Sequence, residues 1–298
     1  MISVAFDYSR VIKMTVKENN ALLLEKLSFY INMCPDAISK ADVKQTAADC
    51  NTSSEEAFKI LLAGALDLYG NKELLNNYLR APGTVKLLDA KKYQKDPYYS
   101  NIRFDNINSG SWSMQTKKYK PYELFVYNDL EELPDGKILP RVGFFDREFP
   151  FPCILQGDRE WMTVTPNEIE TMKEPVSLAH GRVATYGLGL GYFAYMVSNK
   201  PEVTSITIVE ADKEAISLFE KHILPQFPNR GKINVCHTDA LLFASDQKTK
   251  ANSDYDFIFA DIWHDASDGL DIYRILKPLE RPDTMYSYWI EKTLKCYM

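Results

Sequence analysis

Glycine is scarce in this sequence. The chain has 13 glycines in 298 residues, well below the usual share of roughly 7%. Four of the 13 nevertheless fall within eleven positions, from Gly181 to Gly191. Because glycine has no Cβ, it allows a backbone to turn sharply or to approach a ligand closely. This window is therefore the first place in the chain to look for a binding site.

Long apolar runs and paired cysteines are also missing. No apolar run approaches the roughly 20 residues that span a bilayer, and residues 1–17 lack the pattern of a secretory signal. The five cysteines are scattered, without paired spacing, which predicts free thiols in a reducing compartment. We interpret Cys153, which follows Pro152, as a core thiol. We expect a cytoplasmic protein with no membrane segment.

Positive charge is not in excess. The formal net charge is −6 and the pI is near 5.4, which argues against a protein held mainly by nucleic-acid phosphates. Residues 43–62 faintly resemble a helix-turn-helix, but Glu55 and Glu56 would place carboxylates where phosphates should lie. No Cys or His pair has metal-ligand spacing. We expect a small-molecule substrate, no nucleic acid and no metal, and leave a homo-oligomer open.

Three regions differ in pattern. Apolar residues recur at three- and four-residue spacings in residues 19–32 and 54–68, and Asn71 can cap a short helix, Lys72–Tyr78. Ser53 and Glu56 have the spacing of a capping box. This predicts a mainly helical domain over residues 1–110. Residues 111–178 contain short alternating runs separated by turn-forming pairs, which predict small β-hairpins. The runs are Tyr122–Tyr127, Arg141–Phe145 and Glu160–Thr165.

Residues 179–298 alternate apolar runs with helical stretches. The runs are Arg182–Tyr186, Ser205–Val209, Ile233–Cys236 and Asp256–Ala260, and the helical stretches are 190–199, 212–223 and 239–246. Such alternation predicts right-handed crossovers and a parallel sheet, so the fold class is α/β with a Rossmann-like domain. The functional residues of such a sheet lie at the carboxyl ends of its strands.

The glycine window follows the first of these strands. Gly187, Gly189 and Gly191 form a Gly-x-Gly-x-Gly turn before a helix, and Glu210 ends the next strand 19 positions later. A carboxylate there can accept hydrogen bonds from both hydroxyls of a ribose. A dinucleotide fingerprint would need glycine where Tyr192 stands, and no Gly-Lys-Ser/Thr follows to make a P-loop. The loop by itself is also compatible with a tight turn that binds nothing.

Carboxylates also follow the third and fourth strands. Asp239 and Asp261 occupy these positions, so successive strand ends carry the glycine loop, Glu210 and two aspartates. With these residues, positions 182–265 resemble the cofactor half of class I S-adenosylmethionine-dependent methyltransferases. The resemblance implies that the three glycines line the methionine moiety, Glu210 holds the ribose, Asp239 the adenine amino group, and Asp261 lies beside the reacting centre.

Upstream, residues 155–161 and 168–180 resemble the segments that lead into the nucleotide loop of spermidine synthases. Two features depart from that branch. Leu190 stands where those enzymes carry an aspartate, and Asp261 and Asp265 replace their Asp-Ser-Ser/Thr-Asp tetrad. Only 37 residues follow Asp261, and they look helical over 270–279 and 286–296. The sequence therefore predicts that the fifth to seventh strands of the family are missing, and either the middle hairpins supply that edge or the sheet is truncated.

The segment from Asp261 to Asp265 is the densest group of reactive side chains. His264 can act as a base near neutral pH, with Asp265 orienting it and Trp263 stacking on a substrate. Alternatively, Trp263 packs under the loop and Asp265 caps the next helix. We predict an S-adenosylmethionine-dependent methyltransferase with catalytic residues Asp261, His264 and Asp265. The alternatives are an aminopropyltransferase-like enzyme and a non-catalytic protein that binds S-adenosylmethionine.

Overall fold

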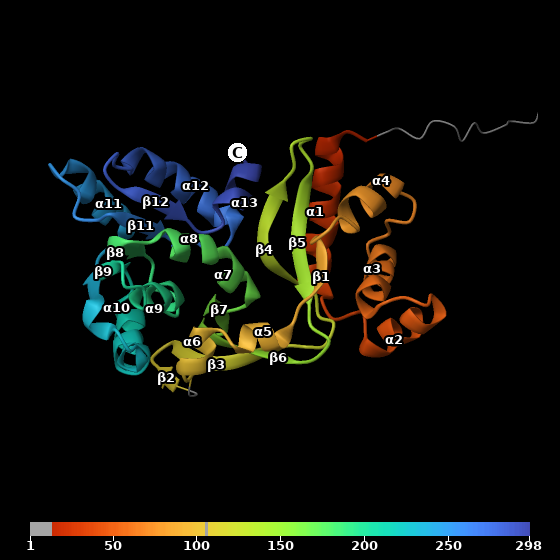
Figure 1. Cartoon of the computed structure of the whole chain (residues 1–298), viewed down its shortest axis with the longest axis horizontal. Helices are drawn as coiled ribbons and strands as arrows, with labels where there is room; N and C mark the ends of the chain where they lie inside the picture. The colour runs from red at the N-terminus through yellow and green to blue at the C-terminus, as the bar shows by residue number, and fades with distance from the viewer. Residues whose placement is uncertain (1–13, 105–106) are drawn as a thin grey trace, which may run out of the picture.

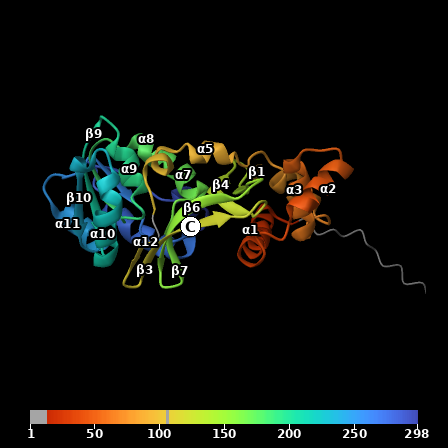
Figure 2. The same cartoon turned by 90° about the horizontal axis from the view of Figure 1, so that it is seen from below.

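The computed structural model describes residues 14–104 and 107–298. At one end of the molecule the chain forms four helices, and at the other it forms a parallel sheet flanked by helices (Figures 1 and 2). The four helices are α1 (Val16–Met33), α2 (Lys40–Asp49), α3 (Ser54–Ala65) and α4 (Lys72–Leu74). Among all the residues that the structure describes, no helix is both long and apolar enough to cross a membrane.

The helices that the sequence predicts near the N-terminus are confirmed. In α1, Leu23, Leu27 and Tyr30 recur at three- and four-residue spacings and are buried, as an amphipathic helix requires. Asn71 caps α4 by accepting a hydrogen bond from the Leu74 amide. The predicted capping box of α3 is only half formed. Ser53 accepts from the Glu56 amide, whereas the Glu56 carboxylate is paired with Arg80, with Oε1 3.3 Å from Arg80 Nε.

A three-stranded sheet links these helices to the rest of the chain. It has the order β1-β5-β4 and consists of β1 (Val85–Leu87), β5 (Ile138–Phe144) and β4 (Phe125–Glu132). Phe58 of α3 stacks on Phe144 of β5, with ring centroids 4.0 Å apart. Phe125, the first residue of edge strand β4, and Leu124, which precedes it, belong to different hydrophobic cores. This strand therefore lies where the helical core meets the core of the parallel sheet.

A second, four-stranded antiparallel sheet has the order β2-β3-β6-β7. Its strands are β2 (Ile107–Ser109), β3 (Trp112–Tyr119), β6 (Phe149–Gln156) and β7 (Arg159–Thr163). The predicted hairpins are confirmed as β4–β5 and β6–β7. Four short helices lie between the sheets along the chain: α5 (Ala90–Gln94), α6 (Pro97–Asn101), α7 (Pro166–Thr171) and α8 (Lys173–Leu178).

The third sheet is five-stranded, and every neighbouring pair in it is parallel. Its order is β10-β9-β8-β11-β12, which confirms the predicted α/β class. The strands are β8 (Gly181–Tyr186), β9 (Val203–Glu210), β10 (Ile233–His237), β11 (Phe257–Ala260) and β12 (Met285–Tyr288). All four residues of β11 are buried because helices cover both faces of a central parallel strand. The helices are α9 (Tyr192–Ser198), α10 (Lys213–Leu218), α11 (Ala240–Thr249), α12 (Ala266–Leu276) and α13 (Glu291–Cys296).

The sheet has a fifth strand that the sequence did not reveal. Residues 286–296 were expected to be helical, but β12 pairs in parallel with β11 and α13 begins only at Glu291. β12 has only four residues, of which only Tyr288 is buried, so periodicity could not distinguish it from a helix. The alternative in which the middle hairpins supply this edge is wrong, since they form two separate sheets.

Candidate functional site

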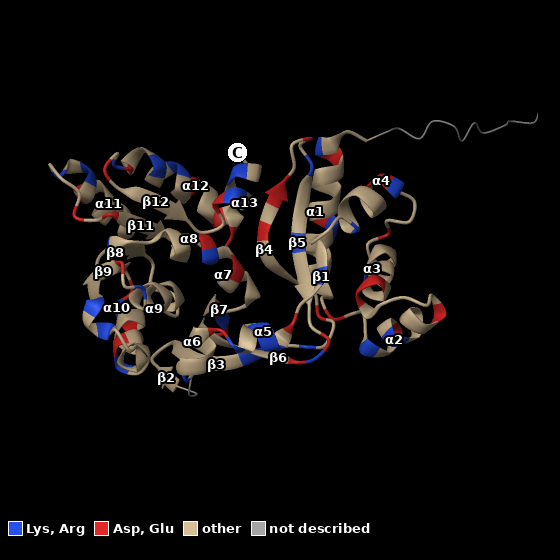
Figure 3. Cartoon of the chain, in the orientation of Figure 1, with Lys and Arg blue, Asp and Glu red and all other residues tan. Residues whose placement is uncertain are grey.

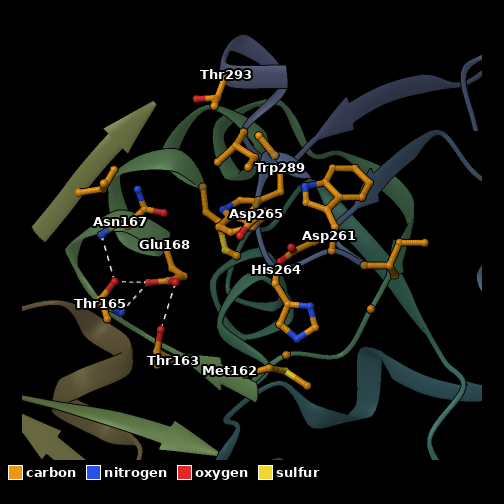
Figure 4. Close-up of a pocket in the computed structure, with 18 of the residues that line it drawn as sticks. Met162, Thr163, Thr165, Asn167, Glu168, Asp261, His264, Asp265, Trp289 and Thr293 are labelled. Atoms are coloured by element: carbon orange, nitrogen blue, oxygen red, sulfur yellow. Dashed lines mark hydrogen bonds between the residues drawn. The ribbon is translucent and has the colours of Figure 1, made fainter. Parts of the chain in front are cut away.

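A cleft of about 1450 Å³ lies at the carboxyl ends of the parallel strands. It is lined by the glycine loop after β8, the ends of β9 and β11, strand β7 and helix α7, and it extends to β4 and α1. β8 and β11 are neighbours whose following connections run to opposite sides of the sheet. Ligands bind outside such a switch point in open α/β sheets. Figure 4 shows residues from these separate segments around one space.

The three loop glycines have different structural roles. All three have positive φ, with 94° at Gly187, 56° at Gly189 and 76° at Gly191. A Cβ on Gly187 would lie 2.0 Å from the carbonyl oxygen of Asp261, and one on Gly191 would lie 2.6 Å from the Phe219 ring. Packing within the protein therefore accounts for two of the glycines. Gly189 differs, because its Cβ would meet nothing closer than Met162 Sδ at 3.7 Å.

Hydrogen bonds of two tyrosines hold this loop and the start of α9 against α6. Tyr98 donates a hydrogen bond to the carbonyl oxygen of Leu190, and the Tyr192 hydroxyl donates to Asp96 Oδ2 at 3.0 Å. The Tyr98 and Tyr192 rings pack edge to face, with centroids 5.4 Å apart. The phenol of Tyr192 is therefore held against α6, not directed across the loop as a barrier to a pyrophosphate.

Glu210 lies at the end of β9 and lines the cleft. Its Oε2 accepts a hydrogen bond from the Leu188 amide at 3.2 Å, and its Oε1 accepts from the Asp212 amide at 2.8 Å. Each carboxylate oxygen has two lone-pair directions. The two amides thus hold the carboxylate in place, and each oxygen keeps one further acceptor position.

Asp239 is the N-cap of α11. Its Oδ1 accepts from the amides of Leu241 and Leu242, at 2.8 and 3.0 Å. Oδ2 makes no hydrogen bond to the described residues, and Asp239 is exposed and lines the cleft. The two oxygens can therefore have separate roles, one in capping the helix and the other in accepting from a ligand amino group.

Asp261 and Glu168 are two carboxylates that face the same cleft. Burial raises the pKa of Asp261 to about 8, and the negative charge of Glu168 adds to this shift. Glu168 comes from α7, where its carboxylate accepts from the Thr165 amide at 2.7 Å and from Thr163 Oγ1 at 3.1 Å (Figure 4). Burial also raises the pKa of Glu168. Our sequence reasoning missed Glu168 as a site residue, although the Thr165–Glu168 capping box was visible.

The segment after Asp261 has the second of the two arrangements that the sequence left open, in which Trp263 packs under the loop and Asp265 caps the next helix. His264 Nδ1 lies 3.1 Å from Oδ2 of Asp268, and Asp268, unlike Asp265, can orient the imidazole. Asp265 instead caps α12 by accepting from the Ser267 amide at 2.7 Å. Trp263 is buried against Gly269, so it packs beneath the segment and is not available to stack on a substrate. The ring nearest to His264 is Trp161 of β7, edge to face at 4.8 Å.

The structure brings most of the predicted residues to one cleft. The loop glycines except Gly191 line it, together with Glu210, Asp239, Asp261, His264 and Asp265. Gly191 instead turns the chain into α9. All five cysteines are free, and Cys153 is fully buried in β6. Among the described residues, no three His, Cys, Asp or Glu side chains come together as a metal site.

Comparison with known proteins gives a likeness in part of the fold. No protein-family model matches the chain, and no curated protein matches it. Among solved structures, 136 chains match. One is the precorrin-8w decarboxylase of Methanobacterium thermoautotrophicum, which is 17% identical with a TM-score of 0.28. The match covers 39% of this chain and 61% of that one, so it spans less than two thirds of that protein.

Proposed function

We propose that this protein binds S-adenosylmethionine in the cleft and transfers its methyl group to a small-molecule acceptor. The observation that carries the proposal is the carboxylate of Glu210, held by two backbone amides at the end of β9 with acceptor positions left over. Two neighbouring diol hydroxyls are a suitable partner for such a carboxylate. Asp239 Oδ2 supplies the acceptor for an adenine amino group farther along the same edge.

The glycine loop fits the remaining part of this ligand. A side chain at Gly189 would occupy space beneath Met162, which is room that a ligand chain can use. The sulfonium of this ligand carries a positive charge. When bound, S-adenosylmethionine would supply a methyl group activated by that positive charge. Asp261 would serve as the proton acceptor for the nucleophile, since its raised pKa suits a general base near neutral pH.

Calorimetric titration of the full chain with S-adenosylmethionine, its demethylated product and its decarboxylated form tests the proposal. We expect saturable binding of the first two. Preference for the decarboxylated form would instead favour the aminopropyltransferase-like alternative. Heat without any turnover across an acceptor panel would favour the non-catalytic alternative. No binding of any of the three ligands would overturn the proposal.

A further inference from the structure

The cleft is far more acidic than the chain as a whole. The chain has 41 acidic and 35 basic residues, but seven Asp or Glu residues line the cleft, and Arg141 is the only Lys or Arg among the described lining residues. The guanidinium of Arg141 is already paired with Glu131, and its Nη1 donates to the Pro82 carbonyl oxygen at 2.8 Å. The cleft therefore disfavours an anionic acceptor.

Four of these carboxylates have no described role in binding the nucleoside or in an ion pair, and two of the four accept hydrogen bonds from nearby backbone amides, Glu123 from Lys120 and Asp265 from Ser267. Glu160 pairs with Lys117 at 2.5 Å, whereas Glu210 and Asp239 are assigned to the ribose and the adenine. Glu168 and Asp261 form no ion pair with a described Lys, Arg or His residue, and Glu168 receives only neutral donors. Two partly desolvated carboxylates that line one cleft (Figure 4) are costly to ionise together, and a cation bound by both offsets that cost.

The cleft also continues beyond these carboxylates along an apolar wall. Leu24 and Ile31 of α1 line this extension, together with Val126 and Leu130 of β4. Val126 is 44% exposed although it is a large apolar residue. The whole volume of about 1450 Å³ exceeds the roughly 300–1000 Å³ of an ordinary single-ligand pocket. The cleft thus has room for a nucleoside and for a second molecule with an apolar body.

We propose that the acceptor is an amine with an apolar body, whose ammonium group binds between Glu168 and Asp261 and whose apolar part lies against β4 and α1. This inference rests on the proposed function, because it assigns the remainder of the same cleft. Figure 3 shows acidic residues on α7 and β4, the elements that border this extension. An ammonium group donates to both carboxylates, and the body gains roughly 25 cal/mol for each Å² of apolar surface removed from water.

Octylamine is the probe for the first experiment. Its dissociation constant is measured by calorimetry on the full chain, with and without saturating S-adenosylhomocysteine. The comparison compounds are 1-octanol, octanoate and 1,4-diaminobutane. We expect octylamine to bind at least about tenfold more tightly than each of them, because only octylamine combines one cation with an apolar chain.

Two variants locate the binding groups. Glu168→Gln should weaken octylamine binding about tenfold or more, and glutamine still completes the capping box with Thr165. Glu148→Gln is the matched control, because Glu148 lies outside the cleft and pairs with Lys118. Val126→Ser should weaken octylamine but not ethylamine. Val126 is largely exposed, so this variant should fold normally, and thermal unfolding of every variant checks that it does.

The outcomes separate this inference from the proposed function. If S-adenosylhomocysteine binds but octylamine binds no better than 1-octanol, the inference is overturned and the proposed function stands. If 1,4-diaminobutane binds more tightly than octylamine, the proposal that the acceptor has an apolar body is wrong. If octylamine binds with the expected dependence on Glu168 while no nucleoside ligand binds, the amine site is supported and the proposed function fails.

Discussion

Gly187 and Asp261 are in such close contact that no side chain fits between them. Gly187 follows β8 and Asp261 follows β11, and the Asp261 amide donates to the Tyr186 carbonyl oxygen at 2.8 Å. A Cβ on Gly187 would lie 2.0 Å from the Asp261 carbonyl oxygen. The glycine loop and the candidate proton acceptor are thus held together at the switch point of the sheet.

Gly187→Ala should destabilise the protein by about 2–4 kcal/mol, because alanine disfavours a φ of 94° and its Cβ would force the two strand ends apart. Urea unfolding measures the change. Gly231→Ala is the control, since a Cβ there would meet nothing within 4 Å. Equal stabilities of the two variants would show that this contact does not constrain the loop.

Glu210→Ala should weaken the binding of S-adenosylhomocysteine by about 1.5–3 kcal/mol, the scale of a lost hydrogen bond to a charged group. Calorimetry gives the affinity. Glu220→Ala provides an exposed control outside the cleft. Because Glu210 also accepts from the Leu188 amide, urea unfolding should accompany the titration. An unchanged affinity would remove Glu210 as the ribose ligand.

The pH dependence of stability should report Asp261. Its folded pKa of about 8 lies above the unfolded value of about 3.9, so the folded state holds the proton more tightly. The stability that the neutral carboxyl contributes is complete below about pH 4 and is lost as the pH rises toward 8.

Asp261→Asn should therefore flatten this decline by up to about 1.4 kcal/mol per pH unit. Urea unfolding of wild type and variant at several pH values between 5 and 8 tests it. Asp271→Asn is the control, because the side chain of Asp271 is 84% exposed. Parallel curves for wild type and D261N would show that Asp261 is ionised throughout this range.

Thr293→Val should destabilise the junction between β4 and α13 by about 1–3 kcal/mol. The Thr293 hydroxyl donates to Asp129 and accepts from the Leu130 amide at 3.1 Å. Without it, a half-buried carboxylate and an amide each lose a partner. Thr293→Ser keeps the hydroxyl and should unfold in urea as the wild type does, whereas similar losses in both variants would point to the methyl group instead.

The recurring patterns of the sequence predicted much of the fold. Four of the five parallel strands, the main helices and the two hairpins follow from apolar periodicity and turn residues. The strand β12 escaped because it has only four residues and its register depends on β11. Its pairing is a property of the sheet, and no local pattern within residues 285–288 specifies it.

The features of the candidate site also fall into two groups, those that the local sequence determines and those that the tertiary structure determines. The sequence by itself determined which residues follow the strands, namely the glycine loop, Glu210, Asp239 and Asp261, because strand ends and turns depend on neighbours only a few positions away. Only the tertiary structure decided that Glu168 lines the same cleft as Asp261 and that Asp268, not Asp265, contacts His264. It also showed that the scarce glycines serve two purposes. Gly187 and Gly191 permit close packing and Gly189 leaves space, because what surrounds a missing Cβ is set by distant segments of the folded chain.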